Sequence, residues 1–323
     1  MTITLRSLRG AIFWLPLALL LGGCGSNTAP GVAESTAQDF VTPPFYRIDG
    51  NAGGTLLLMG TVHLGPPEGW RFSPAIRKGL DRADRFILEL DLRLVTEDAV
   101  SSLLANKVLL QPPNSLLDVV SPETARLLEK NDAKLAAMGM PRDARKWKKP
   151  WYVALWLLES ASVQSGLVAS ASAESVIFEA LGDRPLLGLE TFEEQLGFFD
   201  DLSPELQDVM LQDSLRRLDA AVDEIQTLVS AWKRGDEKRL EEMARDGIDE
   251  LPNLKKFYDV MLTDRNQRWM TIFETLLDDP EYAGRTIFVG VGALHLVGET
   301  GLVHLLRESG YEVEAIDQVV ETL

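Results

Sequence analysis

Two of the three histidines in the chain occupy the same local motif. Each follows an apolar run that ends in glycine, with two residues between glycine and histidine: TLLLMGTVHLG contains His63, and TIFVGVGALHLVG contains His295. A glycine allows a tight turn or a close approach to a ligand, so each histidine could point back over a strand end. Imidazoles bind divalent metal ions and carry protons near neutral pH. The motifs are therefore candidates for one shared site.

Two glutamates belong to similar apolar runs. Glu89 stands between leucines in FILELDL, and Glu190 ends the run LLGLE. A carboxylate among leucines needs a partner, because burying an unpaired charge is costly. Two imidazoles and two carboxylates at neighbouring strand ends would suit Zn²⁺, Mn²⁺ or a similar divalent ion. One carboxylate could bind the ion and the other could act as general base on water, and the residues leave open which does which.

The other polar candidates are divided between the site and structural roles. Arg265 and Asn266 occur together in LTDRNQRW, on a predicted long helix. Such a charge cluster is usually solvated, but Arg265 could instead reach the site and hold a carboxylate or an oxyanion. Glu194 follows Thr191 at the spacing of a capping box, so it is predicted to cap a helix. His304, in GLVHLLRESG, is predicted to be structural.

The elements that position these residues are predicted from the hydropathy pattern. Continuous apolar runs suit strands of a sheet covered on both faces, and an alternating run suits an edge strand. Helical patterns separate the runs, as crossover connections do, and ligands of such sheets bind beyond the carboxyl ends of the strands. The predicted strands are Thr55–Met59, Arg85–Leu90, Pro185–Leu189, Thr286–Val291 and, at an edge, Tyr311–Ile316.

Helix starts are marked by serine followed by proline, which suits an N-cap residue and the first helical position. The three predicted N-caps are Ser73, Ser121 and Ser203. Long amphipathic patterns fill roughly 203–234 and 253–278. We therefore expect an α/β domain over residues 44–320, with a helical cap made of roughly 121–165 and 203–278.

The N-terminus has the pattern of an export signal. Arg6 and Arg9 precede a short apolar stretch, and LGGC resembles a lipobox in which Cys24 is lipidated. Residues 1–23 are then a lipoprotein signal peptide, and residues 24–43 a flexible tether rich in small residues. The alternative is an ordinary signal peptide with an incidental cysteine, and a secreted or periplasmic protein. Because Gly25 rather than Asp follows the cysteine, we expect the outer membrane, facing the periplasm.

Charge and cysteine content exclude several classes of function. The net charge is −17, and it becomes −19 when Arg6 and Arg9 are removed with residues 1–23. This acidity argues against nucleic acid as a partner, which requires clustered Lys and Arg. Cys24 is the only cysteine, so an intramolecular disulfide is impossible and a cysteine nucleophile or thiolate metal site is implausible.

Residues 45–318 resemble the TraB/GumN family, which includes the Tiki proteins. The resemblance rests on GGTLLLMGTVHLG, FILELDL, KKPWYVALWL, RPLLGLETFEEQL, LTDRNQRW and IFVGVGALHLVGETGLVHLLRESGYEVEAI, in that order. It implies an α/β (α+β) fold of the erythromycin-esterase-like and ChaN-like type, with a mixed, largely parallel sheet and an inserted helical lobe. It also implies activity like that of the Tiki proteins, which are divalent-metal-dependent proteases.

The resemblance assigns the site residues by motif. His63 and His295 match the two Gly-x-x-His histidines, and Glu89 and Glu190 match the two acidic positions. Arg265 and Asn266 match the RN pair. One segment departs from the pattern: relatives often have Gly-x-Asp before the GLET motif, whereas ASASAESVIFEA offers only Glu174 as an acidic substitute.

These observations lead to one preferred function and two alternatives. The preferred function is a divalent-metal-dependent hydrolase of the periplasm, most simply a peptidase, with metal ligands His63, His295 and Glu89 and catalytic residues Glu89, Glu190, Arg265 and Asn266. The ion would be Mn, Co or Zn. One alternative is a lipoprotein that sequesters a peptide or a small ligand without turnover, and the sequence does not separate the two. A structural lipoprotein is disfavoured by the retention of both histidines and both glutamates.

Overall fold

Six strands form one sheet in the order β4-β3-β5-β2-β1-β6. The computed structural model describes residues 40–246, 248, 251 and 253–318, so the predicted signal peptide and Cys24 lie outside them. Strands β4, β3, β5 and β2 run parallel to one another, whereas β1 is antiparallel to both β2 and β6. The predicted mixed, largely parallel α/β fold is confirmed. The strands are β1 Phe45–Asp49, β2 Thr55–Thr61, β3 Arg85–Leu90, β4 Leu186–Glu190, β5 Thr286–Gly292 and β6 Glu312–Ala315.

The central strands are apolar throughout because both faces of the sheet are covered. Successive side chains of a strand point to opposite faces. In β2, Leu57 and Met59 belong to the core shared with α1 (Pro74–Arg82) and α8 (Ala173–Leu181). Leu56 and Leu58 belong to the core on the other face. That face is covered by α14 and α15, which are Asp264–Asp278 and Leu302–Glu308.

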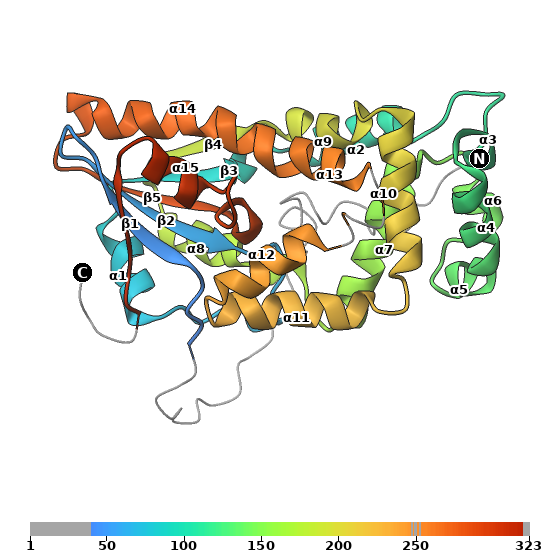
Figure 1. The fold of residues 1–323 in the computed structure, drawn as a ribbon, viewed down its shortest axis with the longest axis horizontal. Helices are drawn as coiled ribbons and strands as arrows, with labels where there is room; N and C mark the ends of the chain where they lie inside the picture. Colours follow the sequence, from blue (N-terminus) through green and yellow to red (C-terminus); the bar gives the residue numbers. More distant parts are fainter. Residues whose placement is uncertain (1–39, 247, 249–250, 252, 319–323) are drawn as a thin grey trace.

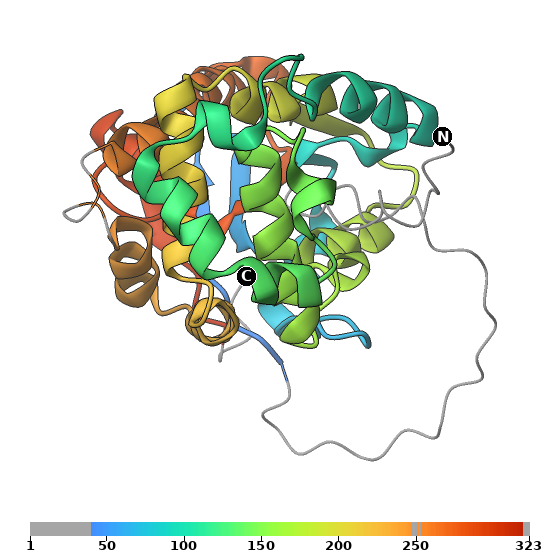
Figure 2. The same cartoon turned by 90° about the vertical axis from the view of Figure 1, so that its right-hand side faces the viewer.

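A helical region extends beyond the carboxyl edge of the sheet, on the right of Figure 1. At its centre, α7 (Pro150–Gln164) packs against α10 (Pro204–Arg216). The buried side chains Trp151 of α7 and Leu211 of α10 belong to the hydrophobic core of this region. Figure 2 shows this region toward the viewer. Its other helices are α2 Glu97–Lys107, α3 Leu116–Val119, α4 Pro122–Lys130, α5 Asp132–Ala137, α6 Arg142–Arg145, α9 Phe192–Asp200, α11 Ala221–Lys233, α12 Glu237–Arg245 and α13 Leu254–Tyr258.

Local sequence signals explain where several helices begin. Ser73, Ser121 and Ser203 each cap a helix whose first residue is proline, as predicted. The predicted pattern 203–234 is two helices, α10 and α11, because the chain turns after Arg216. The pattern 253–278 is interrupted by a π-helical turn at Asp259–Thr263, which joins α13 to α14.

Within the described residues, no helix combines the length and apolar character needed to span a membrane.

Candidate functional site

The carboxyl ends of four parallel strands bring the predicted residues to one edge of the sheet. In the ladder between β2 and β5, Thr61 pairs with Gly292, so the two Gly-x-x-His motifs follow neighbouring strands. In the ladder between β3 and β4, Leu90 pairs with Glu190. Glu89 lies one residue before that pair. This edge is where open α/β sheets bind their ligands.

His63 is held by a carboxylate from α8. Its Nδ1 lies 2.9 Å from Oε1 of Glu174, which is 7 % exposed in the first turn of that helix. Burial by itself lowers the pKa of His63, but the negative charge of Glu174 more than offsets it and raises the pKa to about 9. The contact occupies Nδ1. Because this pKa leaves the ring protonated at neutral pH, its Nε2 carries a proton that a metal ion would have to displace.

His295 is held by Asn266. The Asn266 amide nitrogen donates to the backbone carbonyls of His295 and Thr300, so its oxygen faces the ring and accepts from Nδ1 at 2.6 Å. Nε2 of the ring then accepts a hydrogen bond of 3.1 Å from Nη1 of Arg265. Burial, followed by the charge of Arg265, lowers the pKa of His295 to about 3, so its imidazole is neutral.

Arg265 lies inside the site rather than on a solvated helix face. Its Nε and Nη2 donate to the two carboxylate oxygens of Glu190, each at 2.8 Å. Nη2 also donates to Oε2 of Glu89 at 2.5 Å. The guanidinium carbon lies 4.7 Å from the centre of the Trp269 ring and 5.2 Å from that of Phe198. The arginine is therefore held by two carboxylates and two aromatic faces.

The two carboxylates that share the Arg265 guanidinium have pKa values shifted in opposite directions. Burial alone would raise the pKa of Glu89, but Arg265, the two histidines and the Gly292 N–H lower it well below its usual range. The pKa of Glu190 is raised, because burial and the nearby charge of Glu89 outweigh Arg265 and Gln195. Environments that push the pKa values of two carboxyls apart are typical of acid–base sites.

Gly292 lies at the centre of this cluster. A methyl group placed on it would lie 3.2 Å from Oε1 of Glu89, 3.5 Å from Cδ2 of His295 and 3.8 Å from Nε2 of His63. The two imidazoles are thus closer than the distance of about 10 Å that a shared ion tolerates, given metal–ligand bonds of about 2.0–2.2 Å. The glycine leaves open the space that these three side chains surround.

The donors fit a divalent metal ion in type. Each imidazole has Nδ1 tied to a second residue, which is the usual way that proteins orient a metal-binding histidine. His295 is neutral, and its Nε2 lies 3.9 Å from Oε1 of Glu89. Within the described residues, no three His, Cys, Asp or Glu side chains already converge on one point. The Arg265 guanidinium lies between His295 and Glu89, so its hydrogen bonds compete with metal coordination.

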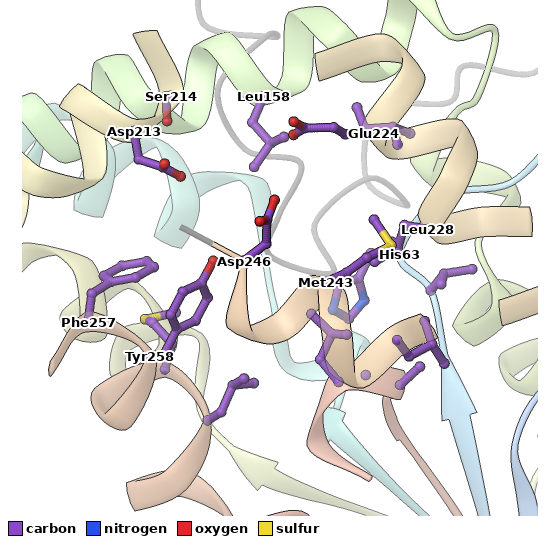
Figure 3. Close-up of a pocket in the computed structure, with 18 of the residues that line it drawn as sticks. His63, Leu158, Asp213, Ser214, Glu224, Leu228, Met243, Asp246, Phe257 and Tyr258 are labelled. Carbon is purple, nitrogen blue, oxygen red and sulfur yellow. The ribbon is translucent and has the colours of Figure 1, made fainter. Parts of the chain in front are cut away.

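The cluster forms one end of a cavity of about 670 Å³. This volume is typical of pockets that bind small molecules. Most of the wall is apolar, and Figure 3 shows Leu158, Leu228, Met243 and Phe257 in it, together with His63.

The far part of the cavity is acidic. Figure 3 shows Asp213, Glu224 and Asp246 there, from α10, α11 and the residue after α12. Arg217 forms ion pairs with all three. Its Nε lies 2.9 Å from Oδ1 of Asp213, and its Nη1 lies 3.4 Å from Oε1 of Glu224 and 2.8 Å from Oδ2 of Asp246. Burial, with help from these acids, raises the pKa of Tyr258 beside them to about 12.

Three other polar residues have separate roles. Glu194 and Thr191 form the predicted capping box at the start of α9. His304 lies on α15, partly exposed, with its Nε2 3.3 Å from Oε1 of Glu308. Arg268 is mostly exposed, and its closest approach to Glu190 is 3.9 Å.

Glu174 is the functional candidate that sequence reasoning did not place in the site. The signal was present, since this carboxylate stands among small and apolar residues in ASASAESVIFEA, where the other acid is Glu179. Such a residue needs a buried partner.

Comparison with known proteins identifies a family. The sequence model of the TraB/PrgY/gumN family matches residues 44–315. The chain belongs to this family. Another chain that it resembles is the uncharacterized protein YbaP of Escherichia coli strain K12, with 26 % identity over 254 residues, which are 77 % of this chain and 87 % of YbaP. YbaP of Shigella flexneri matches to the same extent. No solved structure matches this TraB/PrgY/gumN family chain.

Proposed function

We propose that this chain is a divalent-metal-dependent hydrolase that acts on peptides. The proposal is carried by one observation on two imidazoles that follow neighbouring strands. Each has its Nδ1 in contact with a second residue, Glu174 or Asn266, and its Nε2 on the side of Glu89. The cavity beside them has room for a peptide segment. Membership of the TraB/PrgY/gumN family supports the same conclusion.

The residues would divide the work as follows. His63, His295 and Glu89 would hold the ion, with Glu89 as the carboxylate ligand because its pKa is lowered. A bound divalent ion would supply Lewis acidity beside the cavity. Glu190, whose pKa is raised, would accept and return the proton. Arg265 would hold Glu190 and neutralise negative charge on the substrate.

Asn266 would contribute by positioning. All its described contacts are to His295 and Thr300, so it sets the orientation of the His295 ring. It does so without touching the substrate.

We further propose that the protein is an outer-membrane lipoprotein anchored through Cys24 and facing the periplasm. The support is the charged and apolar pattern of residues 1–23, followed by LGGC. The substrate would then be a peptide of that compartment.

The decisive experiment combines metal analysis with a peptidase assay. The full chain is purified without chelator and without a nickel column, and bound metal is counted by elemental analysis. A peptide mixture is then incubated with the untreated, chelated and Mn²⁺- or Co²⁺-reconstituted protein. We expect about one ion per chain, and cleavage that disappears on chelation and returns with metal. A protein that binds peptides equally before and after chelation, and cleaves none, would instead be a binding protein.

A further inference from the structure

The first described residues of the chain are held between two segments that carry basic side chains. The backbone N–H of Val41 donates to the carbonyl of Arg71 at 2.8 Å, and that of Thr42 donates to the carbonyl of Lys233 at 2.9 Å. The chain therefore enters the domain between the loop before α1 and the end of α11, at the blue start of the ribbon in Figure 1. Side chains of these two segments surround the point of entry.

Three of these side chains are exposed cations, and a tryptophan lies beside them. Arg71, Lys233 and Arg234 are exposed, and none of the three forms an ion pair with a carboxylate among the described residues. Nζ of Lys233 lies 5.8 Å from the centre of the half-buried Trp70 ring. We call Trp70, Arg71, Lys233 and Arg234 the entry patch. Its charges are available to a partner.

The charge around the entry patch is opposite in sign to that of the whole chain, which is −17. Segments 66–78 and 230–238 hold six basic residues and three acidic ones, which are Glu68, Asp236 and Glu237. A fourth acid, Asp317, lies close by, because the next residue, Gln318, donates to the carbonyl of Pro43. The basic residues still outnumber the acids. A positive area on a strongly acidic protein favours an anionic partner.

We propose that the entry patch docks the domain on an anionic lipid surface. The inference rests on the proposed anchoring through Cys24 and deepens it, because it names the face that the anchored domain turns toward the membrane. Lys and Arg are attracted to anionic headgroups, and Trp is enriched at the interface between membrane and water. The anchored chain reaches the domain at this patch, which favours lipid over a soluble anionic partner.

The length of chain before the patch makes weak docking sufficient. Phe40, the first described residue, lies 16 residues after Cys24. A chain of that length spans at most about 55 Å, so the lipid on Cys24 would keep the domain close to the membrane. A short tether gives an effective concentration in the millimolar range, so a contact too weak to hold a free domain holds an anchored one.

The first test measures docking apart from anchoring. Residues 24–323 carrying Cys24→Ser lack the lipid and retain every described residue, because residues 1–23 lie outside the described part. Cosedimentation is measured with vesicles of phosphatidylcholine alone and of equal parts phosphatidylcholine and phosphatidylglycerol. At low salt we expect binding to the anionic vesicles to be at least roughly 10-fold stronger, and to weaken as salt is added. Equal binding to both vesicles would overturn the inference.

Charge variants test whether the patch carries this binding. One variant replaces the three cations of the patch: Arg71→Gln, Lys233→Gln and Arg234→Gln. It should bind anionic vesicles more weakly by roughly 5-fold for each charge removed. The control has the same net charge and replaces three exposed cations on other elements: Lys130→Gln, Lys256→Gln and Arg285→Gln. The control should bind nearly as wild type does. An equal loss in both variants would refute the role of the patch.

A fluorescent label shows which face reaches the lipid. The Cys24→Ser chain contains no other cysteine, so one introduced cysteine takes one environment-sensitive dye. Glu68→Cys places the dye at an exposed position two residues before Trp70, and Leu117→Cys places it on α3, where Leu117 is 59 % exposed. On anionic vesicles, emission should shift to the blue for the dye at position 68 only. A shift at position 117 alone would mean that another face docks, and would contradict the inference.

Failure of the anchoring proposal would be recognisable separately. The vesicle experiments use a chain without lipid, so their outcome does not depend on lipidation, whereas fractionation of Cys24→Ser tests lipidation by itself. Patch-dependent vesicle binding together with unchanged fractionation of Cys24→Ser would reject the anchor and keep the docking surface. An intact anchor together with no preference for anionic vesicles would reject the docking surface alone.

Discussion

Nδ1 of His63 lies 2.9 Å from Oε1 of Glu174 at the edge of the sheet, where Glu174 is buried and His63 is half-buried. A carboxylate on the far nitrogen fixes the ring and makes the other nitrogen a better ligand. We predict that Glu174→Gln lowers metal affinity by about 10- to 100-fold, and that Glu174→Asp restores part of it. Metal titration with a competing chelator measures this. Glu179→Gln, at an exposed position of the same helix, is the control and should bind metal normally.

Each of the two motif histidines should be needed for metal binding. Removing one ligand opens the coordination shell, so His63→Ala and His295→Ala should each lose the ion and the activity together. Elemental analysis and the peptidase assay on the same samples test this. His304→Ala lies outside the site and should keep both. Full metal content in either motif variant would contradict the proposed ligand set.

Replacing Glu190 and replacing Glu89 should have different effects on metal content and turnover. Glu190→Gln should keep the metal and lose turnover by about 10²–10⁴-fold, as expected for a proton carrier. Glu89→Gln should lose the metal, and turnover with it, because Glu89 is the ionised ligand. Metal content and kcat are measured for both variants, with exposed Glu193→Gln as the matched control. The reverse pattern would exchange the two roles.

Glu159 should make stability depend on pH. It is 6 % exposed, and burial raises its pKa to about 8 from its ordinary value of 4.5. Between these values the folded chain holds a proton that the unfolded chain has lost, so stability falls as pH rises and the penalty is complete above about 8. The penalty is at most about 4–5 kcal/mol and is smaller where the carboxyl is hydrated.

Urea unfolding at several pH values measures this dependence. Glu159→Gln removes the charge, so it should be more stable than wild type at pH 9 and should show a flatter pH profile. Glu129→Gln, at an exposed position of α4, should follow wild type. If the stability of Glu159→Gln and of wild type depended on pH in the same way, Glu159 would not be the source of the pH dependence.

Cys24 should decide where the protein resides. In a bacterial host that processes lipoproteins, Cys24→Ser should leave the outer-membrane fraction or retain an uncleaved signal. Fractionation and mass spectrometry of the N-terminus measure both. Outer-membrane association of Cys24→Ser with normal processing would refute the lipidation proposal.

The sequence predicted most of the sheet because burial on both faces leaves a continuous apolar run. It missed β1, whose residues FYRID alternate in polarity. Its pairing with β6 joins Tyr46 to Ala315, and no local pattern encodes such a distant contact. Sequence motifs also identified His63, His295 and both glutamates as candidates for one site. The pairing of His63 with Glu174 could not be derived, because it depends on how α8 crosses the sheet.

The π-helical turn at Asp259–Thr263 ends two residues before Arg265, and its Met261 carbonyl accepts a hydrogen bond of 3.1 Å from Nη1 of that arginine. Such wide turns hold one residue more than an α-helical turn and often lie near functional sites. Each residue added to a helix rotates everything after it by about 100°. The turn therefore fixes which side of α14 faces the sheet relative to the side of α13 that faces the cavity. Phe257 of α13 lines the cavity, and Phe273 of α14 packs on the sheet. Deleting a single residue here would swing the guanidinium away from both carboxylates while leaving every site residue present. At this point of the chain, segment length matters more than amino-acid identity.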